Sequence, residues 1–159
     1  ALQYPMPLTD PKFDPFQMEA EVAINLIAPA LLAHALLPAL RRHGKQAAII
    51  NISSGLAYFP KQQSALYCAT KAALSNFTQS LGYQLEQDGV LVSEVILPLV
   101  DTPMTKGRGM GKITADTAAH AIIAGIENRR QKIYVGKAKL LPILSRLAPS
   151  VGRKILRGS

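Results

Sequence analysis

Short apolar runs and longer segments rich in Ala and Leu alternate along the 159-residue chain. The apolar runs predict strands over 47–52, 90–97 and 132–135, because strands covered on both faces carry unbroken apolar side chains. The longer segments consist largely of good helix formers and predict helices over 17–42, 64–86, 115–128 and 138–156. Strands that alternate with helices are typical of α/β domains built on a parallel sheet.

Proline residues modify this pattern in three places. Residues 1–16 contain four prolines and are predicted to form an irregular surface segment. In the first helix, Pro29 and Pro38 should each bend the helix or remove a hydrogen bond without ending it. In the last helix, Pro142 and Pro149 are expected to act as breaks.

Three reactive side chains lie around the first strand and the helix that follows it. Ser54 comes just after the apolar run 47–52, so its hydroxyl should stand at the carboxyl end of that strand, where open α/β sheets place their ligands. Tyr67 and Lys71 are four residues apart and therefore share one helix face. An ammonium near a phenol favours the phenolate and should lower the pKa of Tyr67, which would make it a usable general acid or base.

Taken alone, a tyrosine and a lysine at this spacing form a surface contact more often than a catalytic pair. The surrounding residues favour catalysis, because Asn51-Ile52-Ser53-Ser54 and Tyr67-Cys68-Ala69-Thr70-Lys71 resemble the N-[IV]-S-S … Y-x-[AS]-[ST]-K signature of the short-chain dehydrogenases/reductases. Val22-Ala23-Ile24-Asn25-Leu26 is similar to the start of that family's fourth helix. Pro98-Leu99-Val100-Asp101-Thr102 is similar to its P-G-x-V-x-T loop. Within the family, the segment Asp101-Thr102-Pro103-Met104 and the Lys/Leu-rich tail look most like those of the DltE-type oxidoreductases.

The resemblance implies the C-terminal half of a three-layer, Rossmann-like, doubly wound parallel sheet, with NAD or NADP as the cofactor. It implies roles in catalysis for Asn25, Ser54, Tyr67 and Lys71. Tyr67 would exchange the proton, Lys71 would bind the nicotinamide ribose, Ser54 would hold the substrate oxygen, and the main chain of Asn25 would hold a water that relays protons. The cofactor would also contact Pro98, Val100 and Thr102. In this chain Leu99 replaces the glycine of the loop, and leucine resists a positive φ.

The family resemblance also suggests how subunits and substrate are arranged. The helix over 64–86 would pack against its copy in a second subunit through apolar outer positions, namely Leu74, Phe77, Leu81 and Leu85. Residues around Ser54 would bind a small carbonyl or alcohol substrate, with an apolar wall formed by Tyr58, Phe59, Leu99 and Met104. The glycines at 107, 109 and 111 suggest a mobile lid. They lack the Lys-Ser/Thr pair and the following helix of a phosphate cradle.

Charge is distributed unevenly along the chain. The formal net charge is +8, and nine of the 18 basic residues but none of the ten acidic ones follow Glu127. Such a tail could contact anionic lipid, nucleic acid or an acidic partner. No RNA-binding motif accompanies it, so no nucleic acid is expected, and a solvated or oligomer-facing helix is the simpler alternative.

The remaining composition points to a reducing cytosol. The single cysteine, Cys68, cannot form an internal disulfide and should be a small helix residue packed against the core. No apolar run reaches the length of about eighteen residues that suggests a membrane span, no secretory signal opens the sequence, and no metal site is expected. The protein is therefore predicted to be cytoplasmic.

The glycine-rich phosphate-binding turn that opens a dinucleotide-binding domain is not found in these 159 residues. Three predicted strands are about half of such a sheet, and half a sheet would leave an apolar edge unpaired. We therefore expect a longer chain or a partner chain to supply the first half. Two functions stay open: an NAD(P)-dependent oxidoreductase, and a catalytically silent relative that acts as a binding or scaffolding subunit through its basic tail.

Overall fold

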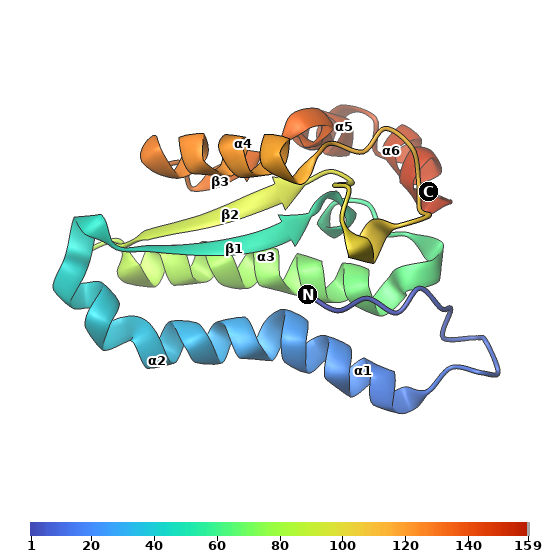
Figure 1. The fold of residues 1–159 in the computed structure, drawn as a ribbon, viewed down its shortest axis with the longest axis horizontal. Coiled ribbons are helices and arrows are strands. Elements are labelled where there is room, and N and C mark those ends of the chain that lie inside the picture. The colour runs from blue at the N-terminus through green and yellow to red at the C-terminus, as the bar shows by residue number, and fades with distance from the viewer. Residues whose placement is uncertain (159) are drawn as a thin grey trace.

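A three-stranded parallel sheet forms the centre of the computed structural model, which describes residues 1–158. The strands are β1 (Ala48–Ser54), β2 (Leu91–Leu97) and β3 (Lys132–Tyr134), in the spatial order β1-β2-β3. In the register, Ser54 pairs with Leu97, so the carboxyl ends of β1 and β2 meet at one edge of the sheet (Figure 1). All three strands lie where the apolar runs predict them, within two residues.

Helices cover both faces of this sheet, as parallel strands require. On one face, α3 (Ala65–Leu85) and α2 (Ala28–His43) pack against alternate residues of β1 and β2, with Leu85 and Val92 fully inside. On the other face, α4 (Ala115–Glu127) packs against Val95 and its neighbours. The predicted α/β class is confirmed, and within residues 1–158 β1 pairs with a strand on one side only.

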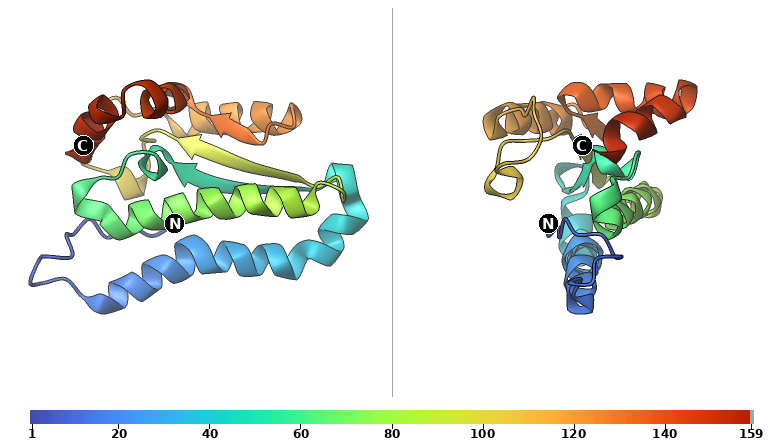
Figure 2. Two further views of the ribbon diagram at one scale, coloured as in Figure 1. Left: turned by 180° about the vertical axis from the view of Figure 1, so that it is seen from behind. Right: turned by 90° about the vertical axis from the view of Figure 1, so that its right-hand side faces the viewer.

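The first predicted helix is divided by a π-helical turn. Helix α1 (Pro15–Val22) runs into the π turn Ala23–Ile27 and then into α2, and together they run alongside α3 (Figure 2). Pro29 explains the position of the turn, because it has no N–H to donate to the carbonyl four residues earlier, which belongs to Asn25. A π turn in this position is of the kind often found at functional sites.

By length and composition alone, the helical run Pro15–Gln46 could cross a membrane, which unbroken apolar runs did not predict. Core helices of soluble proteins meet the same criterion. Two polar residues of this run, Glu21 and Asn25, are buried against the N-terminal segment. The run is therefore weak evidence for a membrane span.

The last predicted helix is three separate pieces. A 3-10 turn (Gly136–Leu140) leads into α5 (Leu141–Leu147) and then α6 (Pro149–Arg157). Pro142 and Pro149 each lie in the first turn of a helix, where a missing N–H costs nothing, so they start helices rather than interrupt one. Helix α6 rests on Phe59: a Cβ added at Gly152 would lie 2.3 Å from the Phe59 ring.

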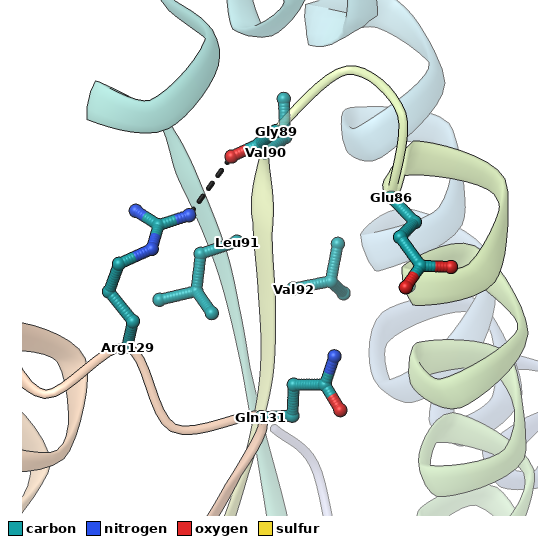
Figure 3. Close-up of a pocket in the computed structure, with 8 residues that line it drawn as sticks. Glu86, Gly89, Val90, Leu91, Val92, Arg129 and Gln131 are labelled. Carbon is teal, nitrogen blue, oxygen red and sulfur yellow. Dashed lines mark hydrogen bonds between the residues drawn. The ribbon is translucent and has the colours of Figure 1, made fainter.

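At the amino ends of the strands, Arg129 ties three connections together. Its guanidinium donates to the backbone carbonyl of Lys45 at 2.6 Å and to that of Gly89 at 2.9 Å. It lines a shallow cavity of about 190 Å³ with Glu86 and Gln131 (Figure 3). This cavity lies at the edge of the sheet opposite Ser54, so it is separate from the predicted site.

Candidate active site

The structure brings the predicted catalytic residues to one end of the sheet. Ser54 is the last residue of β1, and Tyr67 and Lys71 lie on the first turns of α3. Asn25 lies in the π turn, which contacts α3. The loop after β2 reaches the same end (Figure 1). The placement of the reactive groups at the carboxyl edge is thus as the sequence predicts.

Tyr67 is a half-buried phenol next to the Ser54 hydroxyl. Burial raises the pKa of Tyr67, and a hydrogen bond with the Ser54 side chain acts in the opposite direction. Ser54 is itself fixed, since its Oγ accepts the backbone N–H of Leu56 at 3.2 Å. The hydroxyls of Ser54 and Tyr67 therefore form one polar spot at the strand end, on which a carbonyl oxygen can accept two hydrogen bonds.

Lys71 is almost fully buried, at 4% exposure. Its ammonium donates to the carbonyl of Ile52 at 2.7 Å and lies 5.7 Å from the centroid of the Tyr67 ring. Burial lowers the pKa of Lys71 to about 8. Among residues 1–158 it forms no ion pair, so two of its three N–H donors remain available to a ligand hydroxyl.

The expectation that Lys71 lowers the pKa of Tyr67 is wrong for this structure. The pKa of Tyr67 is raised, and the lysine is not among its causes. Two physical reasons account for this. Burial disfavours the phenolate, and the ammonium faces the ring and the Ile52 carbonyl. The chain alone therefore holds Tyr67 as a neutral proton donor.

Asn25 is buried in the π turn, and its side-chain amide is hydrogen-bonded. Its Nδ2 donates to the carbonyl of Leu2, and its Oδ1 accepts the N–H of Leu2, both at 2.7 Å. The same Nδ2 lies 3.3 Å from the Thr70 hydroxyl, which donates to the backbone carbonyl of Tyr67 at 2.8 Å. Asn25 thus connects the N-terminal segment to the helix turn that carries Tyr67.

Two charged residues near Tyr67 carry no sequence signal of their own. Glu21 is 3% exposed, and burial raises the pKa of its carboxyl, while the N–H of Tyr4 acts to lower it. The Glu21 charge acts to raise the pKa of Tyr67, and that of Arg108 acts to lower it. Only the fold shows that Glu21 faces inward.

The loop after β2 is held by its own threonines. Thr105 donates to the carbonyl of Val100 at 2.5 Å and accepts the N–H of Thr102 at 3.1 Å. Val100 forms a parallel bridge with Ile113, and Pro98 begins this loop directly after β2. Among residues 1–158 the only residue other than glycine with positive φ is Arg129, so Leu99 adopts its place without strain.

Of the four residues predicted to form the apolar wall of the substrate pocket, Leu99 and Met104 lie in the loop after β2. Tyr58 and Phe59 lie elsewhere. A Cβ at Gly109 would lie 2.5 Å from the side chain of Leu99, and Met104 is 38% exposed. By contrast, the Tyr58 hydroxyl lies 2.7 Å from that of Tyr134. Phe59 is 3% exposed beneath α6 and packs in a core cluster, so the prediction that it lines the pocket is wrong.

The glycine-rich segment 106–112 closes over the N-terminal segment. Gly107, Gly109 and Gly111 have φ values of 74°, 56° and 69°, in the left-handed region that favours glycine. Between them, Arg108 donates to Gln3 at 2.9 Å, and Gln3 donates to the Ser64 hydroxyl at 3.0 Å. These bonds hold the segment close to the start of α3, as a lid over the site would require.

The subunit contact predicted for α3 needs a correction. Leu74, Leu81 and Leu85 are buried in this chain's own core, and Phe77 packs against the same cluster. The three leucines cannot be outer positions because they are buried, and residues of α2 and β2 pack in the cluster with Leu81 and Leu85. The exposed apolar side chain on this helix is Tyr83, at 67% exposure.

Comparison with known proteins identifies the family. The model of the short-chain dehydrogenases matches residues 6–113, which include the Asn25, Ser54, Tyr67 and Lys71 set and the loop after β2. The chain therefore belongs to the short-chain dehydrogenase family. The resemblance drawn from the motifs is confirmed.

Individual relatives agree with this family. The chain is 33% identical over 119 residues to an uncharacterized oxidoreductase, DltE, of Bacillus subtilis (strain 168), which covers 71% of this chain and 47% of that protein. It superimposes with a TM-score of 0.88 and 27% identity on a short-chain dehydrogenase from Burkholderia cenocepacia J2315 solved with NADP, over 98% of this chain and 65% of that one. A human protein, inactive hydroxysteroid dehydrogenase-like protein 1, is 36% identical over 84 residues, 53% of this chain and 25% of that protein.

The chain spans about half the length of the curated relatives it matches, 47% of DltE for example. Residues 1–158 include the Asn25, Ser54, Tyr67 and Lys71 set and the loop after β2. The glycine-rich turn for a cofactor pyrophosphate is not among them.

Proposed function

We propose that the whole protein is an NAD(P)-dependent oxidoreductase of the carbonyl reductase or alcohol dehydrogenase type. The observation that carries this proposal is the position of Ser54, Tyr67 and buried Lys71 at one strand end. Burial keeps Tyr67 protonated, which suits donation to a carbonyl oxygen. A pKa that burial shifts away from its ordinary value is typical of residues at functional sites.

In the reduction direction, Tyr67 gives its hydroxyl proton to the substrate oxygen while Ser54 donates a hydrogen bond to the same atom. The cofactor, when bound, supplies the hydride to the carbonyl carbon. Proton and hydride together convert the carbonyl to an alcohol, and the phenolate left on Tyr67 keeps the hydrogen bond with the Ser54 side chain, which acts to lower the pKa of Tyr67. In the oxidation direction, the Tyr67 phenolate takes the proton back.

The residues present fit the nicotinamide end of such a cofactor. Lys71 has two free N–H donors for ribose hydroxyls, and it lies next to the Tyr67 phenol. The loop with Pro98, Val100 and Thr102 would hold the carboxamide. Support for NAD(P) comes from the Burkholderia cenocepacia protein, which was solved with NADP, and from one of Sphingobium yanoikuyae solved with NADPH.

The substrate would be a small carbonyl or alcohol compound with an apolar portion beside Leu99 and Met104. We also propose a cytoplasmic homo-oligomer that forms through α3, with exposed Tyr83 in the contact. No nucleic-acid partner is expected.

A catalytically silent binding subunit is the second candidate. Similarity to the human inactive hydroxysteroid dehydrogenase-like protein over 84 residues favours it. Against it, a buried lysine without an ion pair is a cost that a scaffold has no need to carry.

Tyr67→Phe distinguishes the two candidates. In the full-length protein we expect it to abolish NAD(P)H-dependent reduction of a carbonyl panel while leaving NAD(P)H binding, measured by calorimetry, largely intact. Tyr83→Phe, on the same helix but exposed, is the matched control and should keep full activity. Near-normal turnover by Tyr67→Phe would exclude the proposed mechanism, and absence of NAD(P)H binding by the wild type would favour the silent subunit.

A further inference from the structure

Helices α5 and α6 repeat one arrangement of apolar and basic side chains. In α5, Ile143 and Leu147 are exposed, at 57% and 81%. In α6, Val151 and Ile155 hold the equivalent positions eight residues later and are 48% and 61% exposed. Each pair is four residues apart and so lies on one face of its helix. We call these four residues the outer apolar pairs.

The core does not use the outer apolar pairs, because other residues dock both helices. In α5, Leu141 and Leu144 belong to the core cluster that includes Phe59. In α6, Gly152 lies directly on the Phe59 ring, and Leu156 packs against the same cluster. At about 100° per residue, each outer apolar pair lies on the helix face beside the residues that pack on the Phe59 cluster, and it faces away from the core.

Basic residues flank both outer pairs at the same position. Arg146 directly precedes Leu147, and Lys154 directly precedes Ile155; both basic residues are exposed. Four further basic residues lie between 136 and 158, namely Lys137, Lys139, Arg153 and Arg157, and no acidic residue follows Glu127. Exposed apolar side chains edged by cations, without anions, are complementary to the surface of an anionic bilayer.

Other occupants fit this surface less well. Helices α5 and α6 pack over residues of β2 and β3, such as Ile96 and Tyr134. In this three-stranded sheet β1 and β3 each have one unpaired side. Strands added beside β1, at the far side of the sheet, would not cover α5 and α6. Helix α2 also exposes leucines, but its basic residues are confined to its last turn.

We propose that α5 and α6 form a peripheral contact with an anionic lipid surface. The outer apolar pairs enter the headgroup region, and Arg146 and Lys154 bind lipid phosphates. Phe59 and Gly152 hold the two helices against the domain, so the protein would lie on the bilayer with its sheet intact. This proposal is independent of the proposed oxidoreductase activity.

Co-sedimentation with vesicles tests the proposal, using the full chain in which these residues occur. The probes are vesicles of phosphatidylcholine alone and of phosphatidylcholine mixed with phosphatidylglycerol. We expect binding to the anionic vesicles only. R146Q/K154Q should weaken it roughly 25-fold, taking about fivefold for each basic residue near the surface. L147S/I155S should weaken it at least about tenfold through lost apolar burial.

A matched control distinguishes binding by the α5 and α6 surface from a general effect of the positive net charge. K12Q/R42Q removes the same charge from exposed positions elsewhere and should bind like the wild type. Circular dichroism should show that every variant keeps its fold. Failure of the wild type to bind, or an equal loss in K12Q/R42Q, would overturn the proposal. So would a dimer that L147S/I155S converts to a monomer in sedimentation velocity, because the surface would then be a subunit interface.

Discussion

The side-chain amide of Asn25 holds the backbone of Leu2 with two hydrogen bonds of 2.7 Å each. The two residues are 23 positions apart, and the amide is buried in the π turn. The motif predicts that Asn25 acts through its main chain. The structure adds that its side chain closes the N-terminal segment onto the site.

Asn25→Ala should therefore reduce both stability and turnover. It leaves the N–H and the carbonyl of Leu2 without partners, and each such group costs about 1–3 kcal/mol when buried. We expect the free energy of unfolding in urea to fall by about 2–4 kcal/mol. Asn76→Ala, an exposed asparagine on α3, is the control and should change it by less than about 0.5 kcal/mol. An equal, small effect of both changes would show that water replaces the amide.

How far the sequence predicts this site depends on how local each feature is. The shared face of Tyr67 and Lys71 follows from helix geometry over one turn, and Ser54 follows from the end of an apolar strand. The direction of the Tyr67 pKa shift depends on burial and on the distant charges of Glu21 and Arg108. Spacing along the chain contains no information about these.

The same reasoning explains the errors in the fold. Phe59 looks like a pocket residue in sequence because it follows the strand end, but α6, more than 90 residues later, covers it. The leucines of α3 look like an outer stripe because periodicity shows which residues share a face without showing what covers that face.

Lys71→Met should stabilise the protein while removing its activity. The folded-state pKa of about 8 lies below the ordinary value of 10.5, so the protonated lysine costs stability at neutral pH. The cost is at most about 3 kcal/mol by proton linkage, and the lost bond to Ile52 offsets about 1 kcal/mol of the gain. We therefore expect a gain of about 1–2 kcal/mol at pH 7 in urea unfolding.

The pH dependence provides the check on Lys71. Between about 8 and 10.5 the native lysine binds fewer protons than the unfolded one. Wild-type stability should therefore rise with pH across this window relative to that of Lys71→Met. A loss of stability in Lys71→Met at pH 7 would mean that the Ile52 hydrogen bond outweighs the burial cost.

Glu21→Gln should shift the pH profile of alcohol oxidation to lower pH. The carboxylate charge acts to raise the pKa of Tyr67, and oxidation needs the phenolate, so removing the charge lets the base form earlier. We expect the acidic limb of kcat/KM to move to lower pH. Glu19→Gln, exposed on the same helix, removes the same charge and should leave the profile unchanged. Identical profiles for both variants would remove Glu21 from the proton chemistry.

Gly152→Ala should loosen α6 from the domain. The added methyl would lie 2.3–2.7 Å from ring atoms of Phe59, and overpacking of this kind costs about 1–3 kcal/mol. Better helix propensity returns about 1 kcal/mol, so we expect a net loss of up to about 2 kcal/mol. Gly158→Ala, with open space around it, should not destabilise.

The double variant F59L/G152A tests whether this loss comes from the clash. It should recover part of the stability lost in Gly152→Ala, because leucine frees the space that the methyl needs. Additive losses from the two changes would show that α6 does not rest on Phe59.

The two hydrogen bonds of Arg129 bear on the order in which the domain folds. Its two backbone bonds join residues 84 and 40 positions away. Both depend on chain closures that are entropically costly until β1, β2 and α4 are in place. We therefore expect them to form late, after the topology is complete. Interactions absent from the transition state slow unfolding rather than speed folding. We therefore expect Arg129 to slow the unfolding of the finished sheet from the end opposite Ser54.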